Sequence, residues 1–394
     1  MTATQEFTQP IIPAEAQPTD TYVEPVDEFN AGVVFDAVYS VMAKAQQNKE
    51  RYQSPERLDP AVDFCAERFE YANKYLAGLE SQAMRPSDVK EDMVGRAKIR
   101  AEEVYAGRSP ATVGARMQRA GALADTFVGR ASEMYRDGGA DPLVIKMFFN
   151  GLGNLGIISS VGYNDVIRKS DEEVPDGLSQ ASYKAELAGL IAGHADVIEE
   201  NGWIFFNGEK GKRRSTPDTL RTYISARING RPEEVVKNWT EALDGLGIEG
   251  QIVYKVQPGI SRRYETVVVY SDDDSQEDVS RALERFSEIC PDNLLSETVL
   301  LSGKKVAKGV VQTPSPGDLS RLLSYAGEED VSYNQLVCAF TEMALRRSAY
   351  AFASEGKSAA EVNPKKLSER AKPCFAQFIK LAGIDPDTMQ VISS

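Results

Sequence analysis

The fold is decided by LRTYISARINGRPEEVVKNWTEALDGLGIEGQIVYKVQPGISRRYETVVVY, the stretch from Leu220 to Tyr270. This stretch contains most of a predicted strand at Thr219–Ile228, followed by a helical segment and two further strands. In the first strand apolar and polar side chains alternate, so that Arg221 and Tyr223 point to the same side. The order strand, helix, strand, strand is typical of a sheet with helices packed on one face.

The same mixed pattern continues on both sides of this stretch. The predicted strands are Trp203–Phe206, Thr219–Ile228, Gln251–Gln257, Tyr264–Ser271 and Lys305–Gln312, and the predicted helices are Pro232–Leu246, Gln276–Ile289, Ser332–Ala353 and Pro364–Ala382. Asp318–Asp330 is predicted to be a loop. We therefore expect residues 201–390 to form an α+β domain with a mainly antiparallel sheet covered by helices.

Residues 29–200 have helical patterning instead. Apolar residues recur there at steps of three and four, which places them on one face of each helix. A helix is predicted to end at Asp137, and another is predicted over Ser182–Ile198. We expect an N-terminal helical bundle. Residues 1–28 are rich in Thr, Gln, Pro and Glu, and we expect a disordered leader there, with use as a non-cleaved export signal as the alternative.

The composition excludes several classes of protein. The 394 residues contain 45 Lys and Arg against 59 Asp and Glu, a net charge of −14, which argues against a general nucleic-acid or anionic-membrane binder. One His and four scattered Cys leave no metal-ligand spacing, so we expect neither a metal site nor a cofactor. Sparse Cys favours a reducing compartment, the cytoplasm, with simple core packing of the cysteines as the alternative. The apolar segment Pro142–Tyr163 contains Lys146 and four Gly, so we expect no membrane span.

Cationic and phenolic side chains gather on three consecutive predicted strands. In the strand Gln251–Gln257, Lys255 faces away from the apolar side, so it could converge with Arg221 and Tyr223 on a helix-free side of the sheet. Clustered Arg suits a phosphate or a carboxylate. The alternative is an ordinary solvent-exposed face. The candidate site residues are Arg221, Tyr223, Lys255, Arg262, Arg263 and Tyr270.

Three further features have simpler interpretations. By parity Arg262 shares a face with Tyr270, whereas Arg263 would do so only across a bulge. His194 lies on an apolar helical stripe, which favours a packed residue over a catalyst. The basic run Gly208–Arg214 is typical of a solvated hairpin tip, with phosphate or partner binding as the alternative.

The stretch from Leu220 to Tyr270 resembles the core of the HopA-type type III effector family, a domain also found in the putative lyase components of class V lanthipeptide synthetases. The shared pattern is Arg-x-Tyr on a strand, a helix, a strand with Lys255, and an Arg before a strand that ends in Tyr270. AKGVVQTPSPGDL and SYNQLVCAFTEMAL are similar to the family's later strand and helix. The resemblance covers roughly residues 200–385.

More distantly, the layout is similar to the phosphothreonine lyases, which remove phosphate by metal-free β-elimination. This resemblance implies Lys255 as the base, Tyr223 as the acid and Arg221, Arg263 and Tyr270 as the phosphate pocket. Two positions depart from these families. Tyr223 stands where the lyases place an acid His, and Val337 stands where the HopA-type family often has an Arg.

Three functions therefore stay open. The first is a lyase acting on phosphoserine or phosphothreonine of a peptide or protein. The second is a non-catalytic effector or binding module whose basic face docks a phosphorylated or acidic partner. The third is a scaffold whose helical half is the interaction surface. A partner kinase or a chaperone would fit the first two functions.

Overall fold

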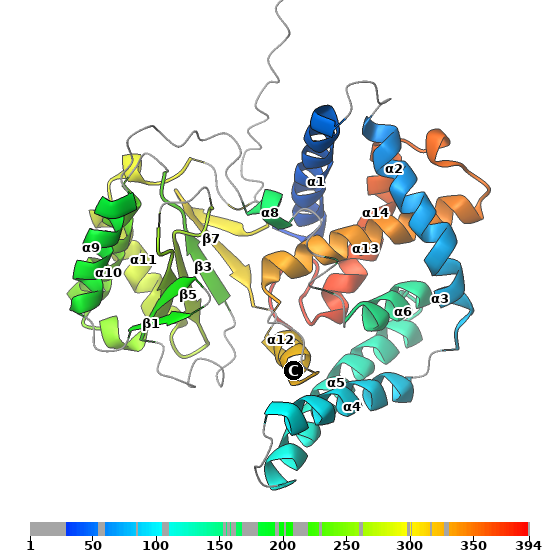
Figure 1. Cartoon of the computed structure of the whole chain (residues 1–394), viewed down its shortest axis with the longest axis horizontal. Coiled ribbons are helices and arrows are strands. Elements are labelled where there is room, and N and C mark those ends of the chain that lie inside the picture. The colour runs from blue at the N-terminus through cyan, green and yellow to red at the C-terminus, as the bar shows by residue number, and fades with distance from the viewer. Residues whose placement is uncertain are drawn as a thin grey trace, which may run out of the picture.

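The protein has an α+β fold in which a helical N-terminal region precedes a seven-stranded antiparallel sheet, as predicted (Figure 1). The computed structural model describes residues 29–53, 60–83, 86–104, 110–152, 155, 158, 163–167, 180–193, 197–200, 202–207, 220–227, 231–259, 263–297, 300, 302–315, 317–326 and 331–392. The predicted leader (1–28), His194, the basic run Gly208–Arg214 and the candidate residue Arg262 lie outside these residues.

Helices make up the first part of the chain. They are α1 (Ala31–Gln53), α2 (Pro60–Tyr71), the π-helical turn η1 (Ala72–Leu76), α3 (Ala77–Ser81), α4 (Pro86–Val104), α5 (Pro110–Arg136), α6 (Pro142–Gly151) and α8 (Tyr163–Val166). Gly138, at a φ of 69°, follows the end of α5, because a residue without Cβ adopts this left-handed conformation without strain. The Asp141 carboxylate then accepts a hydrogen bond from the Leu143 N–H and caps α6, which has a Pro in its first turn.

The sheet has the strand order β1-β2-β4-β5-β3-β7-β6, and every pair is antiparallel. The strands are β1 (Val197–Glu200), β2 (Trp203–Phe206), β3 (Leu220–Ile224), β4 (Val253–Val256), β5 (Val267–Ser271), β6 (Lys304–Ala307) and β7 (Val310–Pro314). The two strands with Arg221 and Lys255, β3 and β4, are therefore separated by β5 alone.

One face of the sheet is covered by α9 (Gln180–Ala192), α10 (Pro232–Leu246) and α11 (Gln276–Ile289), at the left of Figure 1. Trp239 of α10 is fully buried there, edge-on to Tyr254 of β4 and to Phe286 of α11. Phe206 of β2 stacks on Tyr254 at 4.7 Å between ring centroids. Alternation along each strand sends the neighbouring residues to the opposite face.

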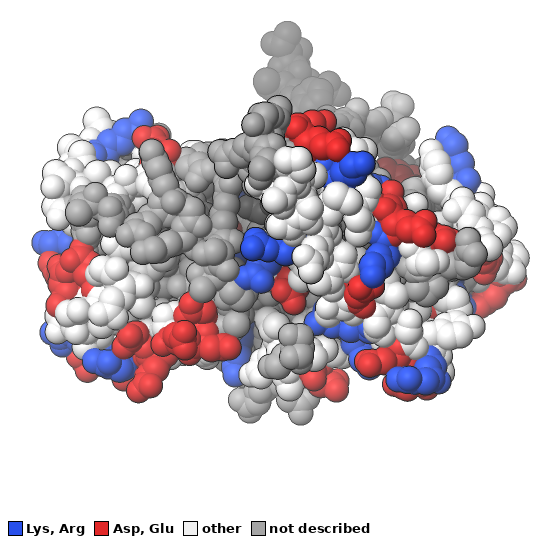
Figure 2. Space-filling view, turned by 90° about the horizontal axis from the view of Figure 1, so that it is seen from below, with Lys and Arg blue, Asp and Glu red and all other residues white. Residues whose placement is uncertain are grey.

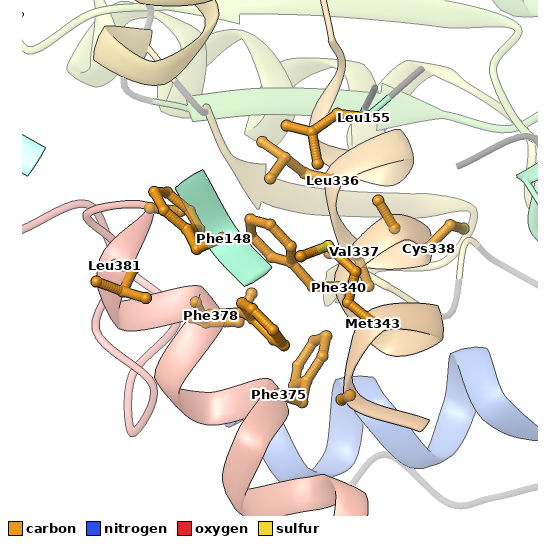
Figure 3. Close-up of a cluster of buried hydrophobic side chains, with 14 of the residues drawn as sticks. Phe148, Leu155, Leu336, Val337, Cys338, Phe340, Met343, Phe375, Phe378 and Leu381 are labelled. Carbon is orange, nitrogen blue, oxygen red and sulfur yellow. The ribbon is translucent and has the colours of Figure 1, made fainter. Parts of the chain in front are cut away.

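The C-terminal helices pack on the N-terminal ones. They are α12 (Gly317–Ala326), α13 (Tyr333–Ser354) and α14 (Pro364–Leu381). In the core that Figure 3 draws, Phe340 of α13 contacts Phe148 of α6 at 5.9 Å and Phe378 of α14 at 5.5 Å between centroids. The helical core is thus built from both ends of the chain. The division into two domains at residue 200 stays a prediction.

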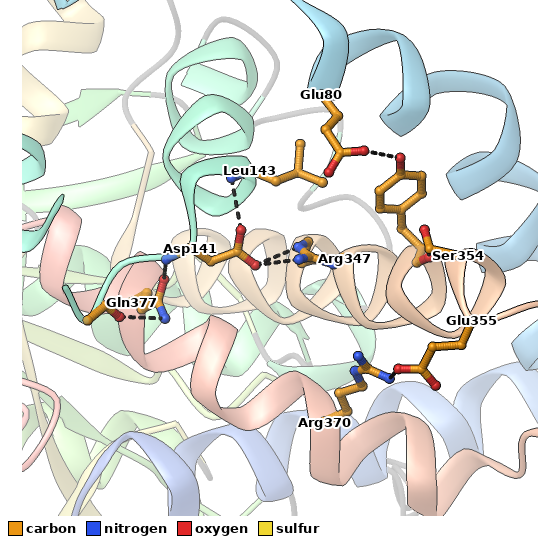
Figure 4. Close-up of polar contacts among 10 residues, drawn as sticks. Glu80, Asp141, Leu143, Arg347, Ser354, Glu355, Arg370 and Gln377 are labelled. Atoms are coloured by element: carbon orange, nitrogen blue, oxygen red, sulfur yellow. Dashed lines mark hydrogen bonds and ion pairs between the residues drawn. The ribbon is translucent and has the colours of Figure 1, made fainter.

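Polar contacts also join the two ends of the chain. Arg347 of α13 pairs with Asp141 at 2.6 Å, and the Asp141 N–H donates to Gln377 of α14 at 2.9 Å (Figure 4). Deeper inside, Arg68 of α2 pairs with Glu342 of α13 at 2.6 Å, with both side chains buried. These contacts set the position of α13, which runs from the sheet across the helical half (Figure 1).

Several local predictions need correction. The predicted helix Ser182–Ile198 ends at Ala192 instead, and its last two residues belong to strand β1, which pairs with β2 around a turn at Gly202 (φ 72°). The described part of the predicted loop Asp318–Asp330 contains α12, whose apolar side is buried. The predicted strand Lys305–Gln312 is a hairpin of β6 and β7 around Gly309, at a φ of 65°. Within the described ranges, no helix is long and apolar enough to cross a membrane.

Candidate functional site

Four of the six candidate residues lie on one face of the sheet, opposite α10 and α11. Arg221 of β3 pairs directly with Tyr270 of β5, and Tyr223 pairs with Val268. Val268 also pairs with Lys255 of β4 on its other side. Because directly opposed residues in an antiparallel ladder project to the same face, Arg221, Tyr223, Lys255 and Tyr270 share that face.

Lys255 is half-buried among aromatic rings. Its Nζ lies 4.1 Å from the ring centroid of Trp203, 5.8 Å from that of Phe205 and 5.9 Å from that of Tyr270. Phe205 is its direct neighbour on β2, and Trp203 is two residues away on the same side of that strand. Among the residues that the structure describes, the Lys255 amine has neither an ion pair nor a hydrogen bond.

Tyr270 links this amine to the guanidinium of Arg221. The Arg221 Cζ lies 5.3 Å from the Tyr270 ring centroid, and Arg221 is the direct neighbour of Tyr270 on β3. The ring therefore contacts one cation from β3 and a second from β4. Both contacts fall within the range in which the ring quadrupole attracts a cation.

Arg263 lies near the same ring system but is engaged by a carboxylate. It pairs with Glu265 at 2.6 Å, donates to the Tyr163 hydroxyl at 3.4 Å and lies 5.5 Å from the Trp203 ring centroid. Glu265 is buried, so this pair neutralises much of the positive charge of Arg263. Burial, with Glu265 nearby, raises the pKa of Tyr163 to about 12, which keeps its hydroxyl protonated.

Tyr223 differs from the other candidates because it is only 2 % exposed. Burial raises its pKa, although Arg221 acts in the opposite direction. Its part of the face packs with Tyr333 and Leu336 of α13 in the helical core. The expectation of a helix-free face is therefore wrong for this part of the sheet, where the C-terminal helix lies over it.

We use the name cation–aromatic face for Arg221, Lys255, Arg263, Trp203, Phe205 and Tyr270. Trp203, Phe205, Glu265 and Tyr163 were not among the predicted site residues. Parity could have placed Trp203 and Phe205, since Ile204 and Phe206 between and beside them are buried on the other side. Tyr163 could not have been placed, because α8 reaches the site through tertiary packing.

The cation–aromatic face contrasts with the charge elsewhere on the molecule. The whole chain carries a net charge of −14, and Figure 2 shows Asp and Glu side chains gathered over the sheet-containing half in the view from below. Two cations, Arg221 and Lys255, share this sheet face, and Arg263 has its charge paired with the buried Glu265. In the described part of the chain, no three His, Cys, Asp or Glu side chains are grouped to hold a metal ion.

The comparisons with known proteins yield structural likeness alone. No protein-family model matches the chain, and no curated protein matches its sequence. An effector protein from Pseudomonas syringae pv. syringae strain 61 aligns with a TM-score of 0.39 and 15% identity, over 63% of this chain and 98% of that one. An effector protein from Pseudomonas syringae pv. tomato strain DC3000 aligns with a TM-score of 0.37 and 14% identity, over 62% and 97%. Likeness of this degree identifies neither a family nor an activity.

Proposed function

We propose that this protein is lyase-like and removes phosphate from phosphoserine or phosphothreonine of a peptide or protein by metal-free β-elimination. The observation that carries the proposal is the Lys255 amine, which has no ion pair or hydrogen bond within the described residues and shares a sheet face with Arg221 and Tyr270. An amine that is not held by a carboxylate can turn toward a substrate that binds on the same face.

The chemistry needs three groups. The Lys255 amine takes the proton from Cα of the phosphorylated residue. The electron pair left on Cα forms the double bond to Cβ, the Cβ–O bond breaks, and phosphate leaves with the bridging oxygen. Arg221 would bind the phosphate as its charge develops, in the bidentate manner that suits guanidinium groups. Arg263, paired with Glu265, would contribute less.

The proton donor to the leaving oxygen is assigned by exposure. The resemblance implies Tyr223, whose side chain is buried. Tyr270 is half-buried and contacts both Lys255 and Arg221. We therefore assign the donor role to Tyr270 instead of the buried Tyr223. A phenol is a weaker acid than an imidazolium at neutral pH, which predicts a slow reaction.

A second function, a binding module for a phosphorylated or acidic partner, is favoured by one observation. Trp203, Phe205 and Tyr270 surround the Lys255 amine with rings that stabilise its cationic form, and this suits docking rather than proton abstraction. In this function the same face binds the phosphate group and releases it unchanged. An effector role, export, a partner kinase and a chaperone stay predictions.

Mass spectrometry of phosphopeptides separates the two functions. Phosphothreonine and phosphoserine peptides incubated with the wild-type protein should lose phosphoric acid and gain a Cα=Cβ double bond. Lys255→Ala should abolish this product. The matched control is Lys237→Ala, which removes an exposed lysine paired with Glu241 on α10. Peptides that bind but stay intact would establish the binding module instead.

A further inference from the structure

Behind Arg221 the structure contains a group of buried polar atoms that lack hydrogen-bond partners. These atoms are Thr313 Oγ1, Ser315 Oγ, Tyr333 Oη and Asn334 Nδ2. Their residues are at most 2 % exposed. Buried polar groups in folded proteins are nearly always paired, so four unpaired groups in one region require an explanation.

Strand register places the first two atoms beside the proposed site. Thr313 of β7 pairs directly with Arg221 of β3, so its side chain projects to the same face as the guanidinium. Ser315, two residues further, directly follows the end of β7. Tyr270, Arg221 and Thr313 thus form one row across β5, β3 and β7.

The other two atoms come from the first turn of α13, which lies near Tyr223 of β3. The Ser332 hydroxyl caps the helix by accepting from the Gln335 N–H, so Tyr333 and Asn334 take no part in the cap. The Asn334 Oδ1 accepts from Ser302 at 2.8 Å, which leaves its NH₂ group as the unpaired end. The hydroxyls of Tyr333 and Tyr223 are near enough that Tyr223 contributes to raising the pKa of Tyr333, after burial.

The backbone packs closely around Thr313. A Cβ on Gly303 would lie 3.0 Å from Thr313 Cγ2 and 3.1 Å from the Gln312 carbonyl oxygen. The backbone at Gly303 therefore lies directly against the Thr313 side chain. The four unpaired groups are three hydroxyls and one amide NH₂, all of which can donate, and they adjoin a guanidinium. A group of side chains that can all donate matches an oxyanion.

We propose that Thr313, Ser315, Tyr333 and Asn334 form an internal oxyanion site that receives the non-bridging oxygens of a phosphoryl group held by Arg221. The identity of the anion rests on the proposed function. Across the sheet the order is then the Lys255 amine, Tyr270, Arg221 and the buried donors. The Cα atom of the substrate therefore lies toward β4, and its phosphate lies toward β7.

Isothermal titration with inorganic phosphate, and separately with phosphothreonine, tests this site in the full chain. Thr313→Val and Tyr333→Phe remove one hydroxyl each at nearly constant volume. Each should weaken binding of both probes by about tenfold or more, since a donor to a charged oxygen is lost. The matched control is Tyr254→Phe, which removes a hydroxyl equally buried and unpaired on the opposite face of the sheet and should leave binding unchanged.

The outcomes separate this inference from the proposed function. Wild-type protein that binds phosphate through Thr313 and Tyr333 but eliminates nothing would keep the oxyanion site and reject the lyase. Elimination with unchanged rates and affinities in both variants would keep the lyase and overturn the site. A structure with phosphate present that holds ordered water only between Thr313 and Tyr333 would overturn the site as well. Thermal unfolding of each variant near that of the wild type establishes that the fold is intact.

Discussion

The Lys255 amine lies 4.1 Å from the centre of the Trp203 ring, on the neighbouring strand of the same sheet face. This contact fixes where the amine points, because Lys255 has no ion pair within the described residues to hold it. The Trp203 ring therefore orients the Lys255 amine, as a paired carboxylate would, but it does not neutralise the charge of the amine.

Trp203→Leu should reduce phosphopeptide binding. A cation over an indole ring is stabilised by about 0.5–2 kcal/mol, and losing the ring that holds the Lys255 amine in place predicts a several-fold loss in affinity. Phe205→Leu is the matched control, since its ring centroid is 5.8 Å from the same amine and the loss should be smaller. Equal losses in the two variants would contradict a specific role for Trp203.

Removing the charge of Glu342 should destabilise the helical half. Glu342→Gln leaves the Arg68 guanidinium buried without a carboxylate, which costs about 3–5 kcal/mol in the free energy of unfolding. Urea unfolding measures this value. Glu297→Gln removes an exposed carboxylate that pairs with Lys308 and should leave the free energy of unfolding close to that of the wild type. A Glu342→Gln variant as stable as the control would contradict the account of this pair.

The same pair predicts how stability depends on pH. Burial raises the pKa of Glu342, but Arg68 and Arg346 lower it more, so the folded-state pKa lies below its ordinary value. A carboxylate with a lowered folded-state pKa stabilises the fold above its unfolded pKa of about 4.3, and this stability is lost as the pH falls further. Thermal unfolding should therefore show a steeper acid loss in the wild type than in Glu342→Gln. Parallel acid limbs would rule this out.

The turn between β6 and β7 should tolerate no side chain. A Cβ on Gly309 would lie 2.9 Å from Leu295 Cβ and 3.0 Å from the Ser225 carbonyl oxygen, in addition to the strain of a φ of 65°. Gly138 has a similar φ of 69° but open space around it. Gly138→Ala should cost about 1–2 kcal/mol, and Gly309→Ala distinctly more, in the free energy of unfolding. Equal costs would show that backbone strain alone matters.

The sequence predicts elements well where local signals bound them. Helix α10 has the predicted bounds because Pro232 occupies its first turn and Gly247, at a φ of 68°, follows its end. Strand β1 was not predicted because its four residues become a strand by pairing with β2, and no local signal separates them from the preceding helix. Helix α12 was missed although Leu319, Leu322 and Leu323 have helical spacing, because Pro and Gly near its start indicated a loop.

The candidate site divides in the same way. Alternation along β3 and β4 predicted that Arg221 and Lys255 could share one face, since parity is a local property, whereas only the strand register places Tyr270 with them. The burial of Tyr223 was not predictable, because the α13 residues that cover it are over a hundred positions later in the chain. The unpaired hydroxyl of Thr313 was likewise invisible, since its isolation depends on the same long-range packing.

The most direct test of the central claim compares Lys255→Ala with Lys237→Ala on phosphothreonine and phosphoserine peptides, read by mass spectrometry. The account predicts that the wild type and Lys237→Ala convert at least one of these peptides to its dehydrated form, and that Lys255→Ala converts none while retaining the fold. Peptides left intact by the wild-type protein, or converted equally well by Lys255→Ala, would contradict the assignment of this amine as the base.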